Sequence, residues 1–418
     1  MEIRLKNRNE KLIEIRRILN ATQKDMANNG LTREYISMIE SGKRNLSREA
    51  AILVMKNALD YARERNIDLN LDEEFIARTE EEDLCKICEG ISETIENLQS
   101  CNEIVKFAHD NNFKLAEING LKKLANILLI DKQYKEAFKE YTLCLNKIDE
   151  INSNILKENI YNCIGIVKME LTQYEEALIY YKEALNYCYI NNKFDIKSKV
   201  IYNLALTYHN IGKYEKSLEY IENMLKEKLE NRLYVKFRIL QGLNYHNMKR
   251  LDEAIKIYLD TIKHKDIDIN SKIKVYNNIA MCYMNKGNLD TSLIYSDLAL
   301  KSSANIPDLL NKTLQNRGKI NKQMGRYEEA KKYFYEGLKV SEEIMDYEYQ
   351  LKSLKEIHSI ADKQEDSEEG LKAVTKILDI AKANNLKADM AWALDVIINY
   401  AITCNDINIL KIANDVKI

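Results

Sequence analysis

GKYEKSLEYI, residues 212–221, is the stretch that decides the fold, because variants of it recur along the chain. A glycine turn precedes Tyr214, and a small residue, Ser217, follows three positions after it. Equivalent anchors, each followed by Ala or Ser at the same distance, are spaced 37 to 40 residues apart: Tyr134, Tyr174, Tyr214, Leu251, Leu289 and Tyr327. A helix–turn–helix unit of this length cannot bury its apolar face alone, so the repeats are expected to stack into an α-solenoid.

Another amphipathic helix precedes each anchor, as in YNLALTYHNI (202–211) and YNNIAMCYMN (276–285). A column of glycine and alanine recurs in phase within these helices: Gly165, Ala205, Gly242, Ala280 and Gly318. The pattern resembles the tetratricopeptide repeat, and this resemblance implies a right-handed α-solenoid. We predict repeats over 111–384, preceded by connecting and first solenoid helices at 67–110 and followed by C-terminal capping helices at 385–418.

The composition favours an all-α protein, because the 418 residues include one proline and only 12 glycines. No apolar run approaches the ~18 residues of a membrane span, and the N-terminal MEIRLKNRNEKL is too polar for a signal peptide. We therefore predict a cytoplasmic protein without a membrane partner. In that compartment most of the eight cysteines are expected to be free core thiols.

No phosphate-binding loop, dinucleotide fingerprint, GxSxG or HExxH motif occurs, so we predict neither an enzyme nor a cofactor. Cys85 and Cys88 form a CxxC pair, but a structural zinc ion usually needs a second pair, and the chain has none. A contact on one helix is the favoured interpretation, and no metal is predicted. His209 and His246 occupy equivalent repeat positions and could line a ligand surface or respond to pH, although ordinary surface or core histidines are the favoured reading.

Charge divides the chain into a basic N-terminal part and an acidic remainder. Residues 1–66 carry 14 Lys/Arg and 9 Asp/Glu, whereas the rest carries 49 and 56. This asymmetry is expected of a nucleic-acid-binding domain attached to a separate effector module.

The helix signals of residues 1–66 place two short helices around a tight turn. Thr22 and Asp25 form a capping box, Asn29-Gly30 marks the turn, and Thr32 can cap a helix that runs to about Glu40. Ser47 can cap a fourth helix. This arrangement is the one that presents a recognition helix to the DNA major groove.

Residues about 8–62 resemble the Xre, or lambda-repressor-like, helix-turn-helix domain through Gln23, Ile36-Ser37 and the string Ile39-Glu40-Ser41-Gly42-Lys43. The resemblance implies that Gln23 contacts DNA and that Arg16 pairs with Glu40. Helical spacing places four residues outward on the recognition helix, and the loop after it offers phosphate contacts. The predicted DNA-binding residues are Gln23, Thr32, Arg33, Glu34, Tyr35, Ser37, Lys43, Arg44 and Asn45. A degenerate helical hairpin that serves protein contacts is the alternative.

One face of the first helix of each repeat carries recurring lysine and amide residues, at positions separated by 4, 7 and 11 residues. In tetratricopeptide arrays this face lines the concave groove. Asparagine amides can pair with both main-chain groups of an extended peptide, and lysines favour its carboxylates. Asparagine can also recur there for local reasons. The predicted peptide-binding residues, called the polar column below, are Lys199, Asn203, Asn210, Lys236, Asn247, Lys274, Asn278, Asn285, Lys312, Asn316 and Gln323.

A helix-turn-helix followed by such repeats resembles the RRNPP group, the peptide-pheromone-responsive regulators of Gram-positive bacteria. The resemblance implies a homodimer whose groove binds a short signalling peptide in quorum sensing, with control of sporulation, virulence or a similar process. Two heads on one dimer would read double-stranded DNA as an inverted-repeat operator. The alternative is an adaptor whose solenoid binds a protein such as a response regulator, with DNA binding secondary.

Overall fold

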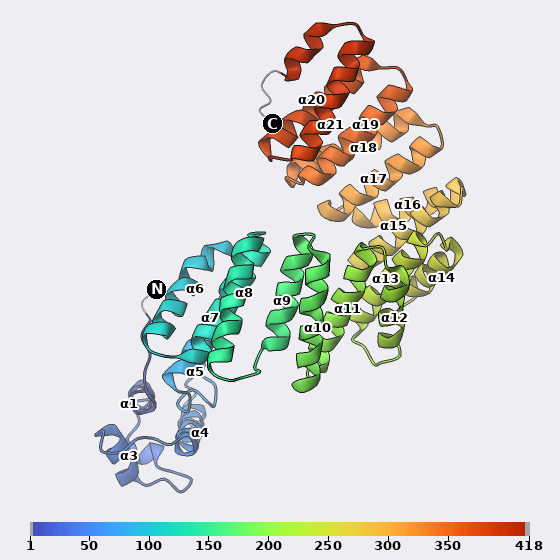
Figure 1. Ribbon diagram of the computed structural model, residues 1–418. Coiled ribbons are helices and arrows are strands. Elements are labelled where there is room, and N and C mark those ends of the chain that lie inside the picture. The colour runs from blue at the N-terminus through green and yellow to red at the C-terminus, as the bar shows by residue number, and fades with distance from the viewer. Residues whose placement is uncertain (1–2, 414–418) are drawn as a thin grey trace. The chain divides into compact units, whose positions relative to one another are not determined.

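All the regular secondary structure of residues 3–413, which the computed structural model describes, is helical (Figure 1). It divides into two compact units, one up to Asn203 and one from Leu204, and each is described by itself. The division falls inside helix α11, Phe194–Asn210. The predicted all-α class is confirmed, since no strand occurs among the described residues.

The helices of the first unit that precede α11 fall into a head and the first solenoid helices. They are α1 (Arg8–Ile18), α2 (Gln23–Met26), α3 (Arg33–Glu40), α4 (Arg48–Glu64), α5 (Glu80–Gly90), the 3-10 helix η1 (Ile95–Asn97), α6 (Leu98–Asp110), α7 (Lys114–Ile130), α8 (Tyr134–Glu150), α9 (Lys157–Glu170) and α10 (Tyr174–Ile190).

The second unit continues the helical pairs. Its helices after α11 are α12 (Tyr214–Met224), α13 (Asn231–Asn247), α14 (Leu251–Ile262), α15 (Ile269–Asn285), α16 (Leu289–Ser303), α17 (Pro307–Gln323), α18 (Tyr327–Glu343), α19 (Tyr347–Lys363), α20 (Ser367–Ala383), α21 (Lys387–Thr403) and the 3-10 helix η2 (Ile407–Ala413).

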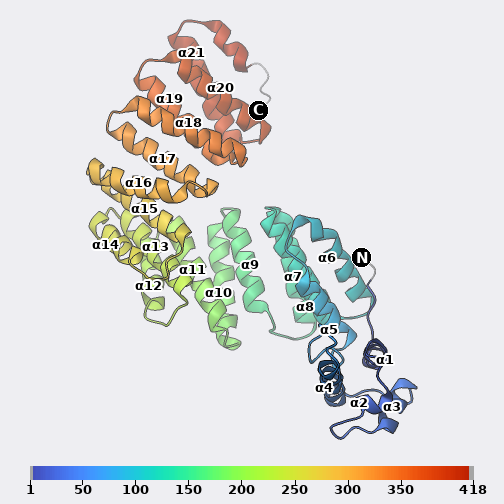
Figure 2. The same ribbon diagram turned by 180° about the vertical axis from the view of Figure 1, so that it is seen from behind.

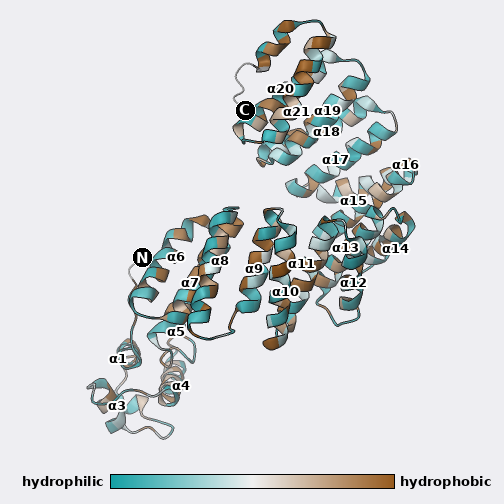
Figure 3. Ribbon diagram, viewed as in Figure 1, coloured by the Kyte–Doolittle hydropathy of each residue, from teal (hydrophilic) through white to brown (hydrophobic). Residues whose placement is uncertain are grey.

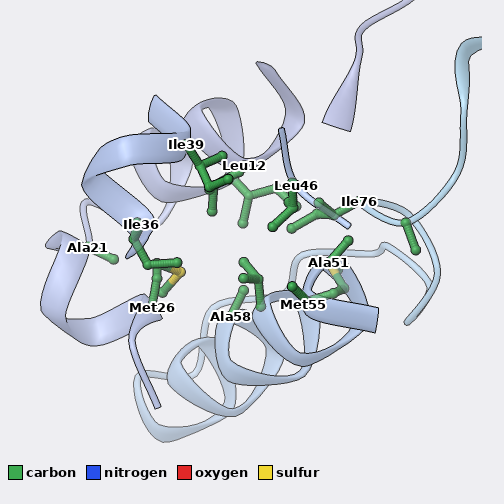
Figure 4. Close-up of a cluster of buried hydrophobic side chains, with 14 of the residues drawn as sticks. Leu12, Ala21, Met26, Ile36, Ile39, Leu46, Ala51, Met55, Ala58 and Ile76 are labelled. Carbon is green, nitrogen blue, oxygen red and sulfur yellow. The ribbon is translucent and has the colours of Figure 1, made fainter. Parts of the chain in front are cut away.

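The head, α1 to α4, forms as the capping signals predict. The Thr22–Asp25 capping box is present, and the side chains of Thr32 and Ser47 accept hydrogen bonds from backbone N–H groups at the starts of α3 and α4. A single apolar core joins all four helices, with Leu12, Met26, Ile36, Ile39 and Met55 facing one another, as Figure 4 shows. The core extends past residue 66, because Ile76 and Ala77 are fully buried in it.

Two segments tie the head to α5 and α6 within the first unit. Ile3 and Leu5, which precede α1, pack on the apolar cluster that contains Leu84 and Ile104. In the segment after α4, Arg78 and Asp83 meet α1: the buried Lys11 ammonium donates to the Arg78 carbonyl at 2.8 Å and pairs with Asp83 of α5. The head is therefore attached to the first solenoid helices by packing and an ion pair that involve the chain before α1 and the chain after α4.

In the solenoid, each predicted anchor is the first residue of the second helix of its pair, from Tyr134 at the start of α8 to Tyr327 at the start of α18. Consecutive helices pack on each other from α5 to α10 and from α12 to α21, and in the second unit α13, α15, α17 and α19 also contact one another in sequence (Figure 2). Figure 3 shows hydrophobic and hydrophilic residues alternating around these helices, as burial of one face requires.

The glycines of the repeat column make room for aromatic rings. A Cβ added to Gly165 or Gly242 would lie 2.5 or 2.4 Å from the ring of Tyr181 or Tyr258, respectively. Both tyrosines are fully buried, so the ring occupies the volume that a side chain would need. This close packing explains why a small residue recurs there.

All eight cysteines are free, and five of them are buried. Burial raises the pKa of Cys88 to about 12, and the neighbouring Cys101 adds to this rise. Cys88 is therefore held as the neutral thiol, and no group of residues that could hold a metal ion occurs within 3–413. None of the helices in that range combines the length and apolar character needed to cross a bilayer.

Candidate functional site

Helix α3 exposes the residues predicted to meet DNA because its opposite face is fixed in the head core. Ile36 and Ile39 are completely buried. The predicted residues that lie exposed on α3 and in the loop after it are Arg33, Glu34, Ser37, Lys43, Arg44 and Asn45. Thr32 is also exposed, and its hydroxyl is used to cap α3.

The prediction that the Tyr35 side chain lies on the outer face of α3 is wrong. This side chain is half-buried and packs against the head core, and the Arg44 guanidinium lies over its ring, 5.0 Å from the centroid. Tyr35 therefore supports Arg44 rather than standing free.

Glu40 holds α1, α2 and α3 together. The Arg16 guanidinium forms a two-point contact with its carboxylate, and the Gln23 amide donates to it at 2.8 Å. Burial favours a raised pKa for Glu40, but the hydrogen bonds from Arg16 and Gln23 outweigh it, so its pKa lies below the ordinary value. The expected Arg16–Glu40 pair is confirmed, and Gln23 has a structural partner in addition to its predicted role.

Asn9 is a positioning residue that the sequence did not reveal. Its amide donates to the carbonyls of Ile39 at 3.2 Å and Arg44 at 3.0 Å, and its oxygen accepts from the backbone N–H of Leu46 at 3.0 Å. Three backbone contacts from one side chain fix the loop that carries Lys43, Arg44 and Asn45. No signal in the sequence marks it, since Asn9 lies between the polar residues Arg8 and Glu10 of α1.

The polar column begins in the first unit with Lys199 and Asn203 of α11. Lys199 is exposed, whereas Asn203 is half-buried and its amide donates to the Asn162 oxygen of α9 at 2.9 Å. The asparagine therefore connects neighbouring repeats as well as belonging to the predicted ligand face.

The lysines of the column in the second unit are all exposed: Lys236, Lys274 and Lys312. Desolvation by surrounding protein lowers the pKa of Lys312, and the charges of Lys274 and Lys352 lower it further. The ammonium groups of Lys274 and Lys352, on the repeats before and after Lys312, thus repel that of Lys312. An anionic group placed among them would relieve that repulsion.

Asn316 does not stand on an open face as predicted. Only 8% of it is exposed, and its amide donates to Asn277 at 3.1 Å. Asn277 in turn donates to the Thr313 hydroxyl at 2.8 Å. Helix α17 buries several polar residues against α15 and α19, and this closer packing takes Asn316 out of the accessible column.

The remaining members of the column are the amide residues toward the C-terminal ends of the first helices. Asn210, Asn247, Asn285 and Gln323 are exposed, and Asn278 is half-buried. Gln323 donates to the Met284 carbonyl at 3.3 Å.

Asn247 and Asn285 contact the two histidines that the sequence placed at equivalent positions. The Asn247 amide nitrogen lies 3.4 Å from His209 Nε2, and the Asn285 amide nitrogen lies 2.8 Å from His246 Nε2. Burial lowers the pKa of His246, which keeps the imidazole neutral near pH 7. These two histidines were not among the predicted ligand-binding residues.

Comparison with known proteins identifies the repeats and the fold. Tetratricopeptide-repeat family models match residues 271–343 and 198–230. No curated protein sequence matches the chain. The apo form of the quorum sensor NprR from B. thuringiensis aligns at 15% sequence identity and a TM-score of 0.56, over 88% of this chain and 97% of that structure.

The apo form of RapI aligns at 12% identity and a TM-score of 0.56, over 88% of this chain and 98% of that structure. At these identities the likeness concerns the fold. The chain therefore has a tetratricopeptide-repeat solenoid of the kind found in NprR and RapI, as its repeats predicted.

Proposed function

We propose that this chain is a peptide-responsive transcriptional regulator of the RRNPP type, a cytoplasmic, non-enzymatic homodimer that binds an inverted-repeat operator. The observation that carries the proposal is the combination of two features in one chain. One is a basic head that exposes Arg33, Ser37 and Lys43 on a firmly held helix, and the other is a solenoid with the fold of a quorum sensor.

DNA binding is supported by the way the exposed residues are held. Ile36 and Ile39 fix the inner side of α3, Glu40 fixes its C-terminal end, and Asn9 fixes the loop that follows. Arginine can then contact base edges while Lys43 and Arg44 contact phosphates. A degenerate hairpin would not need exposed cations on a fixed helix and loop.

Peptide binding is supported by the accessible members of the polar column. In the second unit, exposed lysines precede exposed amides along α13 and α15, so one extended ligand could meet a positive charge and several hydrogen-bonding groups. Binding across several repeats would change the spacing of the two heads, and the resulting coupling free energy would alter operator affinity.

The test begins with the full-length protein and two libraries, one of random duplex DNA and one of linear heptapeptides. We expect the protein to enrich an inverted repeat from the DNA library. We also expect it to enrich at least one heptapeptide that changes the affinity of the protein for that duplex. Arg33→Ala with Ser37→Ala should weaken the enriched duplex by roughly 10- to 100-fold, the effect of losing base contacts.

Arg63→Ala is the matched control, because it removes one exposed charge from the head at the far end of α4. The control should change affinity only slightly. If no duplex is enriched with or without heptapeptide, DNA binding is refuted, and the adaptor function becomes the better explanation provided that a peptide still binds.

A further inference from the structure

A chain of hydrogen bonds runs through the second unit from a backbone carbonyl to the polar column. It begins where the Ser217 hydroxyl of α12 meets the Ala205 carbonyl of α11 at 2.7 Å. The Asn244 amide donates to Ser217 at 2.8 Å, and its oxygen lies 2.8 Å from His209 Nδ1. Ser217 and Asn244 are completely buried.

The chain continues through two exposed amides. His209 Nε2 faces the Asn247 amide nitrogen, the Asn247 oxygen lies 3.3 Å from His246 Nδ1, and His246 Nε2 faces the Asn285 amide nitrogen. It therefore links three successive first helices, α11, α13 and α15.

The carbonyl of Ala205 sets the direction of every bond in this chain. A carbonyl only accepts, so the Ser217 hydroxyl must donate to it and must itself accept from Asn244. The Asn244 oxygen is then left to accept, which requires a hydrogen on His209 Nδ1.

The same reasoning extends outward from His209. His209 Nε2 faces the Asn247 amide nitrogen, which can only donate, so Nε2 accepts and the hydrogen of the ring is the one on Nδ1. The Asn247 oxygen must then accept from His246 Nδ1, and His246 Nε2 accepts from Asn285.

We infer that His209 and His246 are positioning residues, held as neutral Nδ1–H tautomers, that orient the Asn247 and Asn285 amides for ligand binding. This inference rests on the proposed peptide-binding function. The Asn285 amide nitrogen is committed to His246, and its oxygen has no partner among the described residues. Asn285 thus offers an acceptor, which suits a main-chain N–H of an extended peptide.

The orientation depends on Ser217, which is remote from the ligand. Without the Ser217 hydroxyl, the Asn244 amide can rotate, His209 can carry its hydrogen on Nε2, and every later bond can reverse. Asn285 would then present N–H groups outward instead of its oxygen. Other repeats carry alanine at this position, so Ser217→Ala is compatible with the fold.

Ser292→Ala is the matched control. Ser292 is also completely buried and donates to a carbonyl, that of Ala280, at 2.7 Å. The hydrogen-bonded chain of histidines does not pass through it. Both variants lose the same kind of bond, but only Ser217→Ala frees Asn244.

The first measurement is the tautomer of each imidazole, read from ¹⁵N chemical shifts of histidine-labelled full-length protein at pH 7.5. The chain has five histidines, so His→Gln variants assign the signals. Nδ1–H forms at His209 and His246 are expected in the unsubstituted protein and in Ser292→Ala, with a mixture in Ser217→Ala. An Nε2–H form at either residue in the unsubstituted protein overturns the inference.

The second measurement is the affinity of the best heptapeptide from the library. A roughly 3- to 10-fold loss is expected for Ser217→Ala and none for Ser292→Ala, since one ligand hydrogen bond is mismatched. Equal affinities in the two variants overturn the positioning role even if the tautomers are as deduced. If the library contains no heptapeptide that binds, both the proposed peptide-binding function and the role of the histidines in ligand binding are refuted. The tautomers still decide, independently of any ligand, in which direction the hydrogen bonds run.

Discussion

Replacing Gly242 with alanine is the sharpest test of how the repeats pack. A Cβ at this position would lie 2.4 Å from Cε1 and 2.5 Å from Cζ of Tyr258, well inside van der Waals contact. The ring is completely buried and has little freedom to move. Overpacking of this kind costs about 1–3 kcal/mol, whereas the better helix propensity of alanine returns about 1 kcal/mol. A net destabilisation of up to about 2 kcal/mol is expected.

The assay is urea denaturation of the full chain followed by circular dichroism, with the midpoint compared at constant slope. Gly337→Ala is the control, because an added Cβ there would meet its nearest atom at 3.4 Å, an ordinary contact. The control should be neutral or stabilised by up to about 1 kcal/mol from helix propensity.

A double-mutant cycle then tests the cause. An equivalent pair of positions, also 16 residues apart, is occupied by Ala205 and Ile221, so Tyr258→Ile should reduce the cost of Gly242→Ala. The coupling energy should be at least about 1 kcal/mol in favour of the double variant. Additive effects, or a Gly242→Ala variant as stable as Gly337→Ala, would refute the packing explanation.

Three further predictions concern the head and the hydrogen-bonded chain. Arg16→Ala leaves Glu40 without its main partner in a partly exposed pair, so about 1–3 kcal/mol of head stability should be lost and amide exchange in α3 should accelerate. Arg48→Ala breaks the exposed contact to Glu82 and should leave the urea midpoint almost unchanged, but trypsin should cleave the 65–79 linker a few-fold faster. The pKa of His246 in the folded chain is below its ordinary value of 6.5, so the unfolded chain takes up the proton first as the pH is lowered. The urea concentration at the midpoint should therefore decrease as the pH is lowered from 6.5, and it should decrease less steeply in His246→Gln.

The sequence predicted the repeats well because their signals are local and recur. Each anchor at a turn begins a helix, and caps such as Thr32 and Ser47 act within a few residues of themselves. Repetition then strengthens each weak signal. The architecture therefore followed from spacing and from residue size.

The candidate sites were less predictable because helical spacing gives a direction but not the distance to the next element. Tyr35 and Asn316 were placed on open faces, yet one folds onto the head core and the other is covered by packing against α15. Contacts between residues far apart in sequence, such as Asn9 with Leu46 and Asn247 with His209, depend on tertiary approach. A single sequence contains no signal for them.

The attachment of the head by two chain segments limits how such a protein can be recombined. A hybrid joined at residue 66 would separate the head from Ile76 and Ala77, which complete its core, and from the surface that receives Ile3 and Leu5. Under the proposed function, exchange of heads between regulators should therefore succeed only when the first helical pairs travel with them, and a new DNA specificity would be inherited together with the base of the solenoid.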